Sequence, residues 1–200
     1  MKPLRPQPTQ VDVTVLAAEL QRGDPSALDP WYRAEHPDVY RLCFGFLGNA
    51  EDAEDAAQDA MLHLHDHLGS WESSRPYQAW RNKVVLNLCR DRRRRIQARQ
   101  RAEDGLRERP SPSVEDPSAG VEADEAASLL SEALAALTER EREVFVLREL
   151  EGLGTRVVGE MLEIGESSVR SLLTLARRRL RKLLGSKLAP EIVGEEGGRS

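Results

Sequence analysis

Residues 143–184 read EVFVLRELEGLGTRVVGEMLEIGESSVRSLLTLARRRLRKLL and predict the fold of the C-terminal part of the chain. Apolar spacing predicts a helix, then a short helix over 155–162, and finally a long basic helix from residue 166. The short and long helices are separated by a tight turn, Glu163-Ile164-Gly165. This order is typical of a helix-turn-helix, whose last helix lies in the major groove of DNA. The segment is therefore predicted to bind duplex DNA.

The last helix is predicted to have two faces at 100° per residue. The apolar face packs on the preceding helices and comprises Val169, Leu172, Leu173, Ala176, Leu180 and Leu183. The other face is left for DNA, since arginine suits guanine edges and hydroxyl groups suit phosphates. Its first residues, which we expect to reach bases, are Ser167, Ser168, Arg170 and Ser171. The later cluster Arg177–Lys182, which includes Arg177, Arg178 and Arg181, is expected to hold the backbone, and Thr174 lies on the same face. The alternative is an ordinary amphipathic helix with solvated arginines.

A second basic helix is predicted upstream, over residues 77–95. Lys83, Asn87, Arg90 and Arg94 recur on it at helical spacing and form one polar stripe. Three aromatic residues lie beside the stripe or just before it: Trp71, Tyr77 and Trp80. Unpaired bases stack on aromatic side chains beside a basic groove, so this module is predicted to bind single-stranded nucleic acid. Core packing is the alternative for Trp80, whereas Trp71 and Tyr77 flank a polar loop and are expected to be accessible.

Charge is distributed unevenly along the chain. The net charge of the 200 residues is −5, yet residues 81–101 carry nine basic residues against one acid. Residues 102–128 carry eight acids against two arginines. Local fields, rather than the total charge, attract a polyanion. An acidic protein with two basic helices is therefore compatible with DNA binding.

The predicted fold class is all-α, with two small helical domains joined by a flexible acidic linker, because no segment alternates as a strand does. The N-terminal domain, residues 11–100, contains helices near 11–21, 27–36, 38–47, 49–68 and 77–95. Residues 101–127 are rich in proline, glycine and acids and are predicted to be a disordered linker. The second domain covers 128–184 and opens a helix with a capping box at Thr138 and Glu141. Residues 185–200 are predicted to be a disordered tail.

Together these segments resemble the extracytoplasmic-function (ECF) sigma factors of the bacterial sigma-70 family. Residues 49–64, NAEDAEDAAQDAMLHL, resemble the region 2 helix. Residues 75–80, RPYQAW, and 87–92, NLCRDR, resemble the stretch that melts and reads the −10 element. Residues 137–152, LTEREREVFVLRELEG, resemble the start of region 4, which reads the −35 element. The resemblance spans about residues 11–184.

The resemblance implies partners and roles. The chain would join core RNA polymerase through the β′ clamp coiled coil and the β flap, and would open promoter DNA. Residues that would contact the clamp are Glu54, Asp55, Gln58 and Asp59. Without the resemblance, this acidic face is either a docking face or a solvated surface. A separate anti-sigma protein is the family's expected regulator.

The chain departs from the family pattern around the predicted turn. The family usually has glycine where Glu163 stands, a basic residue at Leu172, and a His-Arg pair at Thr174 and Leu175. These departures bear on which −35 sequence is read.

Two other functions would fit parts of the sequence. A conventional helix-turn-helix regulator would need no polymerase, but it leaves the upstream module and the acidic helix without a role. A metal-dependent hydrolase would use His63, His65 and His67, although helical spacing turns His65 away from the other two. We expect no enzyme activity, no cofactor and no metal. Cys43 and Cys89 are expected to be buried free thiols. No apolar run approaches the ~18 residues that span a membrane, so we expect a cytoplasmic protein.

Overall fold

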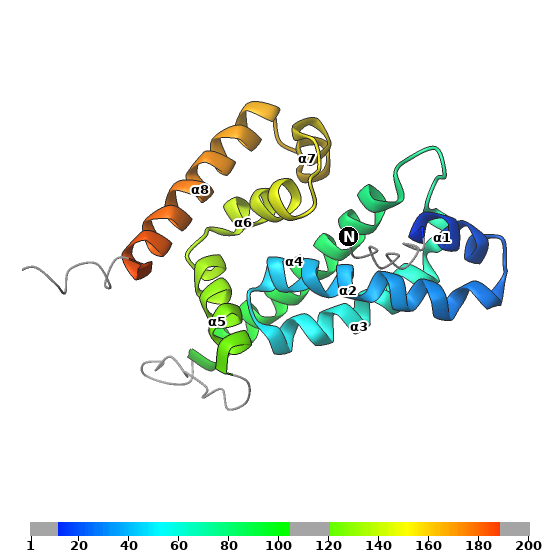
Figure 1. The fold of residues 1–200 in the computed structure, drawn as a ribbon, viewed down its shortest axis with the longest axis horizontal. Helices are drawn as coiled ribbons and strands as arrows, with labels where there is room; N and C mark the ends of the chain where they lie inside the picture. Colours follow the sequence, from blue (N-terminus) through cyan, green and yellow to red (C-terminus); the bar gives the residue numbers. More distant parts are fainter. Residues whose placement is uncertain (1–11, 105–120, 189–200) are drawn as a thin grey trace, which may run out of the picture.

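The computed structural model describes residues 12–104 and 121–188, and within these ranges it contains helices and no strand (Figure 1). The all-α prediction is confirmed for them. The helices are α1 (Val13–Gln21), α2 (Leu28–Leu47), α3 (Ala50–Asp66), α4 (Tyr77–Asp104), α5 (Val121–Ala135), α6 (Glu139–Phe145), α7 (Thr155–Leu162) and α8 (Glu166–Leu188). Shorter turns are η1 (Pro25–Ala27), η2 (Leu68–Ser70) and η3 (Val146–Leu150), the last of which is π-helical. None of these helices is long and apolar enough to cross a membrane.

The N-terminal domain is built from α1 to α4. The alanines of α3, at positions 53, 56, 57 and 60, are buried and let α3 lie close to its neighbours. Asn49 caps α3 by accepting from the amide of Asp52 at 2.9 Å, and Gly48 ends α2 in the left-handed conformation. Both are turn residues that the sequence places between two apolar stripes.

The prediction of separate helices over 27–36 and 38–47 is wrong, because α2 is continuous and contains Pro37. A proline removes one amide donor and disfavours a helix interior. Here Trp31, Glu35, Val39 and Leu42 are buried on both sides of Pro37. Burial of the two halves on one core therefore outweighs the local penalty.

The boundaries of the predicted linker and tail also differ. α4 continues to Asp104 and α5 begins at Val121, so both ends of the predicted linker 101–127 are helical. α8 likewise continues to Leu188, past the predicted end at 184. The rest of the predicted disordered segments, 105–120 and 189–200, lies outside the described residues.

Helix α6 of the C-terminal domain begins with the predicted capping box. Thr138 Oγ1 accepts from the Glu141 amide at 3.3 Å, and the Glu141 carboxylate accepts from the Thr138 amide at 2.9 Å. α6 and η3 then form a continuous support on which α7 and α8 pack (Figure 1). This arrangement leaves one long face of α8 toward solvent.

The two domains pack against each other. Gly45 of α2 lies against Val146 of η3, where an added Cβ would come within 2.9 Å of a Val146 methyl group. The carbonyl of Phe46, at the end of α2, accepts from Arg93 and from Arg142 of α6. The buried core consequently extends from α1 to α8.

Candidate nucleic-acid interface

The turn between α7 and α8 is held by backbone contacts around Gly159. The Ile164 amide donates to the Gly159 carbonyl at 2.9 Å, and the Val169 amide donates to Gly165 at 3.1 Å. An added Cβ at Gly159 would lie 2.8 Å from the Ile164 carbonyl oxygen. Only glycine permits this approach, which sets the angle between α7 and α8.

The predicted DNA-facing residues of α8 lie on its exposed side. All eight are exposed: Ser167, Ser168, Arg170, Ser171, Thr174, Arg177, Arg178 and Arg181. Val169, Leu173 and Ala176 are buried on the opposite side, as the helical period predicts. Leu175, which follows Thr174 in the sequence, is half-buried. α8 therefore presents a cationic face with hydroxyl groups near its N-terminus, where the helix dipole also favours phosphate.

Glu163 occupies the turn in a left-handed conformation, with φ 58° and ψ 45°. Its side chain is 84% exposed, so packing does not compensate for the strain that a Cβ meets there. This geometry explains why glycine suits the position. The carboxylate also adds negative charge beside Glu160 and Glu166, at the edge of the predicted DNA-binding surface.

We expect Glu163→Gly to raise the free energy of unfolding by about 1 kcal/mol, because glycine adopts the left-handed conformation without the steric penalty. Glu163→Ala is the matched control, since it removes the same charge but keeps the Cβ. Thermal unfolding should separate the two variants, whereas both should bind duplex DNA more tightly than the parent. Equal free energies of unfolding for Glu163→Gly and Glu163→Ala would show that the left-handed backbone at this position is not strained.

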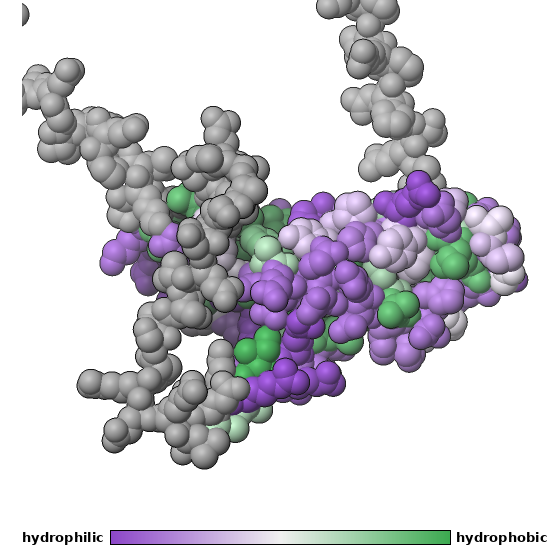
Figure 2. Space-filling model, turned by 90° about the horizontal axis from the view of Figure 1, so that it is seen from below, coloured by the Kyte–Doolittle hydropathy of each residue, from purple (hydrophilic) through white to green (hydrophobic). Residues whose placement is uncertain are grey.

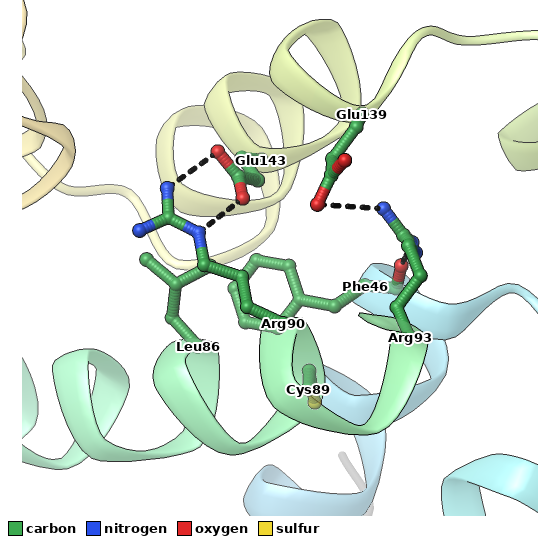
Figure 3. Close-up of a pocket in the computed structure, with 7 residues that line it drawn as sticks. All are labelled: Phe46, Leu86, Cys89, Arg90, Arg93, Glu139 and Glu143. Atoms are coloured by element: carbon green, nitrogen blue, oxygen red, sulfur yellow. Dashed lines mark hydrogen bonds and ion pairs between the residues drawn. The ribbon is translucent and has the colours of Figure 1, made fainter. Parts of the chain in front are cut away.

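The predicted polar stripe of α4 lies partly against the C-terminal domain. Arg90 forms two hydrogen bonds with the Glu143 carboxylate, at 2.6 and 2.7 Å (Figure 3). Lys83 Nζ donates to the Met161 carbonyl at 2.6 Å and lies 3.7 Å from Glu163. Asn87 and Arg94 are exposed. The four residues therefore form a stripe, but two of them, Lys83 and Arg90, are engaged by the C-terminal domain.

The expectation that Trp71 and Tyr77 are accessible is wrong. Trp71 is 3% and Tyr77 4% exposed. Trp71 Nε1 donates to the Arg75 carbonyl at 3.0 Å, and the Tyr77 hydroxyl accepts from Trp31 Nε1 at 3.0 Å. Each aromatic ring folds back into the core because its polar atom finds a partner there. Trp80 is half-buried and remains the aromatic residue available beside the stripe.

The acidic face of α3 is exposed at all four predicted positions: Glu54, Asp55, Gln58 and Asp59. Arg92 of α4 lies 2.8 Å from Asp55 and 3.9 Å from Asp59, so part of this charge is neutralised within the chain. The face that includes α3 is mainly hydrophilic in Figure 2, with hydrophobic residues in small patches. The acidic face is thus available to a cationic partner.

An apolar groove continues the acidic face and was not predicted. It has a volume of about 580 Å³ and lies between α2 and α3. Leu62 on its rim is 67% exposed, and Leu28 and Tyr32 are about 40% exposed. Leu62 lies four residues after Gln58 and so extends the same helix face. The missed signal was an apolar residue on the polar side of an amphipathic helix.

A buried charge cluster was also missed. Glu151, at the end of η3, has a side chain with no exposure, and its carboxylate lies 2.6 Å from Arg81 and 3.1 Å from Arg41. Asn82 Nδ2 adds a hydrogen bond at 3.2 Å. These partners lie about 70 to 110 residues upstream, so no local pattern indicates the cluster.

The histidines and cysteines have ordinary packing roles. The His63 and His67 rings stack with centroids 3.9 Å apart, while His65 lies 3.3 Å from Asp66, as helical spacing predicts. The part of the chain that the structure describes contains no group of three or more side chains placed to hold a metal. Cys43 and Cys89 are buried, and a hydrogen bond between them, together with burial, raises the pKa of Cys43. Such a thiol is a poor nucleophile.

Known proteins share both domains. The family model for Sigma-70 region 2 matches residues 31–100, and that for Sigma-70 region 4 matches residues 127–180. The chain is 35% identical over 176 residues to the ECF RNA polymerase sigma factor SigM of Mycobacterium tuberculosis, covering 87% of this chain and 85% of SigM. It is 27% identical over 175 residues to SigW of Bacillus subtilis, covering 83% and 93% of the two chains.

Solved structures show the same fold. CnrH, solved with the cytosolic domain of CnrY, aligns with a TM-score of 0.63 at 21% identity, over 88% of this chain and 99% of CnrH. The sigma factor RpoE of Bartonella quintana, solved with the anti-sigma factor NepR, also aligns at 0.63, with 18% identity over 78% of this chain and 96% of RpoE. On its sequence matches, the chain belongs to the ECF sigma factors of the sigma-70 family, with region 2 in residues 31–100 and region 4 in residues 127–180.

Proposed function

We propose that the chain binds core RNA polymerase and directs it to promoters, as a non-catalytic initiation factor acting in the bacterial cytoplasm. The observation that carries this proposal is the pairing of two modules in one chain. Region 4 presents the exposed basic face of α8, and region 2 presents both the α4 stripe and the acidic face of α3. A regulator that acts without polymerase has no use for the last two surfaces.

Region 4 is proposed to bind the −35 element as duplex DNA. Ser167, Ser168, Arg170 and Ser171 near the start of α8 would approach bases, since N-terminal residues of a recognition helix do so. Arg177, Arg178 and Arg181 would hold phosphates. Arg177 already pairs with Glu149 at 2.7 Å, so binding would exchange that carboxylate for a phosphate.

Region 2 is proposed to open the −10 element. Asn87 is suited to a base edge and Lys83, Arg90 and Arg94 to phosphates. Trp80 is the aromatic residue best placed to stack on an unpaired base, because Trp71 and Tyr77 are committed to the core. Extrusion of a base costs a few kcal/mol, which stacking and pocket contacts offset.

The acidic face of α3 is proposed to bind the β′ clamp coiled coil of the polymerase, and region 4 the β flap. The groove beside Leu62 adds an apolar anchor to the carboxylates of Asp55 and Asp59. An apolar anchor surrounded by charge is a common arrangement of binding hot spots. An anti-sigma protein is also proposed, because the similar folds of CnrH and RpoE were solved with such partners or with a partner domain.

We expect Leu62→Ala to weaken binding to core polymerase about tenfold, since truncating an apolar hot-spot residue costs more than about 1 kcal/mol. Val15→Ala is the matched control, because Val15 is also an exposed apolar residue, 51% exposed, and lies on α1. Fluorescence polarisation of labelled protein titrated with core polymerase measures both. A loss of affinity with Val15→Ala as large as with Leu62→Ala would remove the groove from the binding site.

Transcription in vitro tests the proposed function as a whole. Core polymerase is supplied with genomic fragments, with and without the protein, and the 5′ ends of the RNA are sequenced. New starts that share two motifs at a fixed spacing are the expected result. Duplex binding by the protein alone, without new starts, would instead favour a conventional helix-turn-helix regulator.

A further inference from the structure

Carboxylates of region 4 lie on the cationic face of α4. The Glu143 carboxylate accepts from Nε and Nη2 of Arg90, and Glu139 lies 3.5 Å from Arg93; dashed lines mark these contacts in Figure 3. Phe46, Leu86 and Cys89 lie beneath these pairs and keep the gap small. Glu143 is 3% exposed, so its charge is withdrawn from water. A two-point arginine–carboxylate pair has the same geometry as an arginine–phosphate pair.

Glu151 forms the second part of this contact. Its side chain is fully buried, and its carboxylate is bound by Arg81, Arg41, Asn82 and Gln78, all from region 2. A buried carboxylate without such partners is strongly unfavourable. Glu151 is therefore satisfied where region 4 rests on region 2, and separation of the two regions would have to return it to water.

Shape complementarity accompanies the charges. Gly45 lets α2 approach η3 closely, and Val146 on the other side is fully buried. Lys83 adds a hydrogen bond to the backbone of α7. The contact thus has a packed apolar centre flanked by ion pairs, as a built interface does.

We propose that this contact is autoinhibitory: region 4 carboxylates occupy, within the same chain, the sites on α4 that would bind promoter phosphates. The proposal rests on the proposed function, because it uses the −10 role of α4. In the closed arrangement Arg90 and Lys83 are engaged by region 4 and are withheld from DNA. Polymerase and promoter DNA open the chain by binding the separated regions, and phosphates then replace Glu143 and Glu163.

The distance between the regions in free protein is the first test. Cysteines introduced at the exposed Ala50 of region 2 and Ala135 of region 4, which flank the close approach of Gly48 to Leu134, carry a donor and an acceptor dye, while the native thiols stay buried. We expect one short-distance population in the parent chain. Combining Glu143→Gln with Glu151→Gln should shift most molecules to longer distances, because the two most buried carboxylates of the contact lose their charge.

The matched control is Glu160→Gln, which removes a carboxylate paired with Arg156 inside region 4 and should leave the distance unchanged. Circular dichroism of each variant checks that the helices remain. A long dye-to-dye distance in the parent chain would overturn the proposal. An unchanged short distance in the double variant would overturn it too.

A reversible disulfide bond between the two regions provides the second test. A Cβ at Gly45 lies 2.9 Å from a Val146 methyl, so the two Cβ atoms are within about 4.4 Å, inside the range for a disulfide. Gly45→Cys with Val146→Cys should therefore cross-link the closed form on oxidation. We expect the oxidised protein to support at least tenfold fewer transcripts with core polymerase, and reductant to restore them. Val146→Cys alone, given the same oxidant, should keep its transcripts.

The two tests separate the inference from the function beneath it. Equal transcription by the oxidised and reduced double variant would overturn autoinhibition while leaving a sigma factor. Absence of transcripts in both states, with the parent chain also inactive, would reject the proposed function. The dye distance in free protein still decides whether the ion pairs close the chain.

Discussion

Replacing Gly159 with alanine is expected to lower the free energy of unfolding of region 4 by about 2–3 kcal/mol. The new Cβ would lie 2.8 Å from the Ile164 carbonyl oxygen, which belongs to the backbone and cannot swing aside as a side-chain tip does. The turn must move by several tenths of an ångström, and with it the start of α8. Since Ser167 to Ser171 depend on that placement, −35 duplex binding should fall at least tenfold.

The control for Gly159→Ala is Gly185→Ala in α8, where no heavy atom lies within 4 Å of the added Cβ. That substitution should be neutral or slightly stabilising, because alanine favours a helix over glycine. Urea unfolding followed by far-ultraviolet circular dichroism, together with duplex binding, measures both variants. Trp31, Trp71 and Trp80 all lie in region 2, so tryptophan fluorescence reports that region separately. A parent-like unfolding curve for Gly159→Ala would show that the turn relaxes without penalty.

The recognition helix was predictable from the sequence because its information is local. The 3.6-residue period placed Val169 and Leu173 inside and Arg170 and Thr174 outside, and the structure has them there. The capping box at Thr138 and the end of α2 at Gly48 were equally local signals. The predicted break at Pro37 was wrong. The free-energy cost of a proline inside α2 is outweighed by burial of the residues on both sides of it, which depends on the packing of the whole domain.

The α4 stripe shows where local information ends. Its spacing placed Lys83 and Arg90 on one face, but their partners, Met161 and Glu143, lie 78 and 53 residues further along the chain. Trp71 and Tyr77 were expected outside because polar residues surround them, yet their polar atoms are satisfied in the core. Pairings of this kind arise from the docking of whole domains, so periodicity and composition do not indicate them.

Glu35→Gln is expected to stabilise region 2 strongly at alkaline pH and little at acid pH. Glu35 has no exposed surface, and its two carboxylate oxygens have no hydrogen-bond partner among the described residues. The nearest cation is Arg81, 3.6 Å away, which Glu151 and Asp38 also engage. Burial raises the pKa of Glu35 from 4.5 to about 7, in spite of the opposing attraction of Arg81.

The direction of the pH effect follows from this pKa. Below pH 4.5 Glu35 is protonated in both the folded and the unfolded chain, so it carries no penalty. Between pH 4.5 and about 7 the unfolded chain ionises first, and folded stability falls by roughly 3 kcal/mol in total. Above pH 7 the full penalty remains. Glutamine keeps the shape of the side chain and removes the charge, so its advantage should grow over this window.

Tryptophan fluorescence during urea unfolding at pH 5 and pH 8 measures the effect in region 2, where Trp31 lies one helical turn before Glu35. The gain in unfolding free energy from Glu35→Gln should be about 2–3 kcal/mol larger at pH 8 than at pH 5. Glu51→Gln, an exposed carboxylate on α3, is the control and should show no such difference. An equal effect of Glu35→Gln at both pH values would mean that the buried carboxylate is already compensated, with Arg81 paired to Glu35 as firmly as to Glu151.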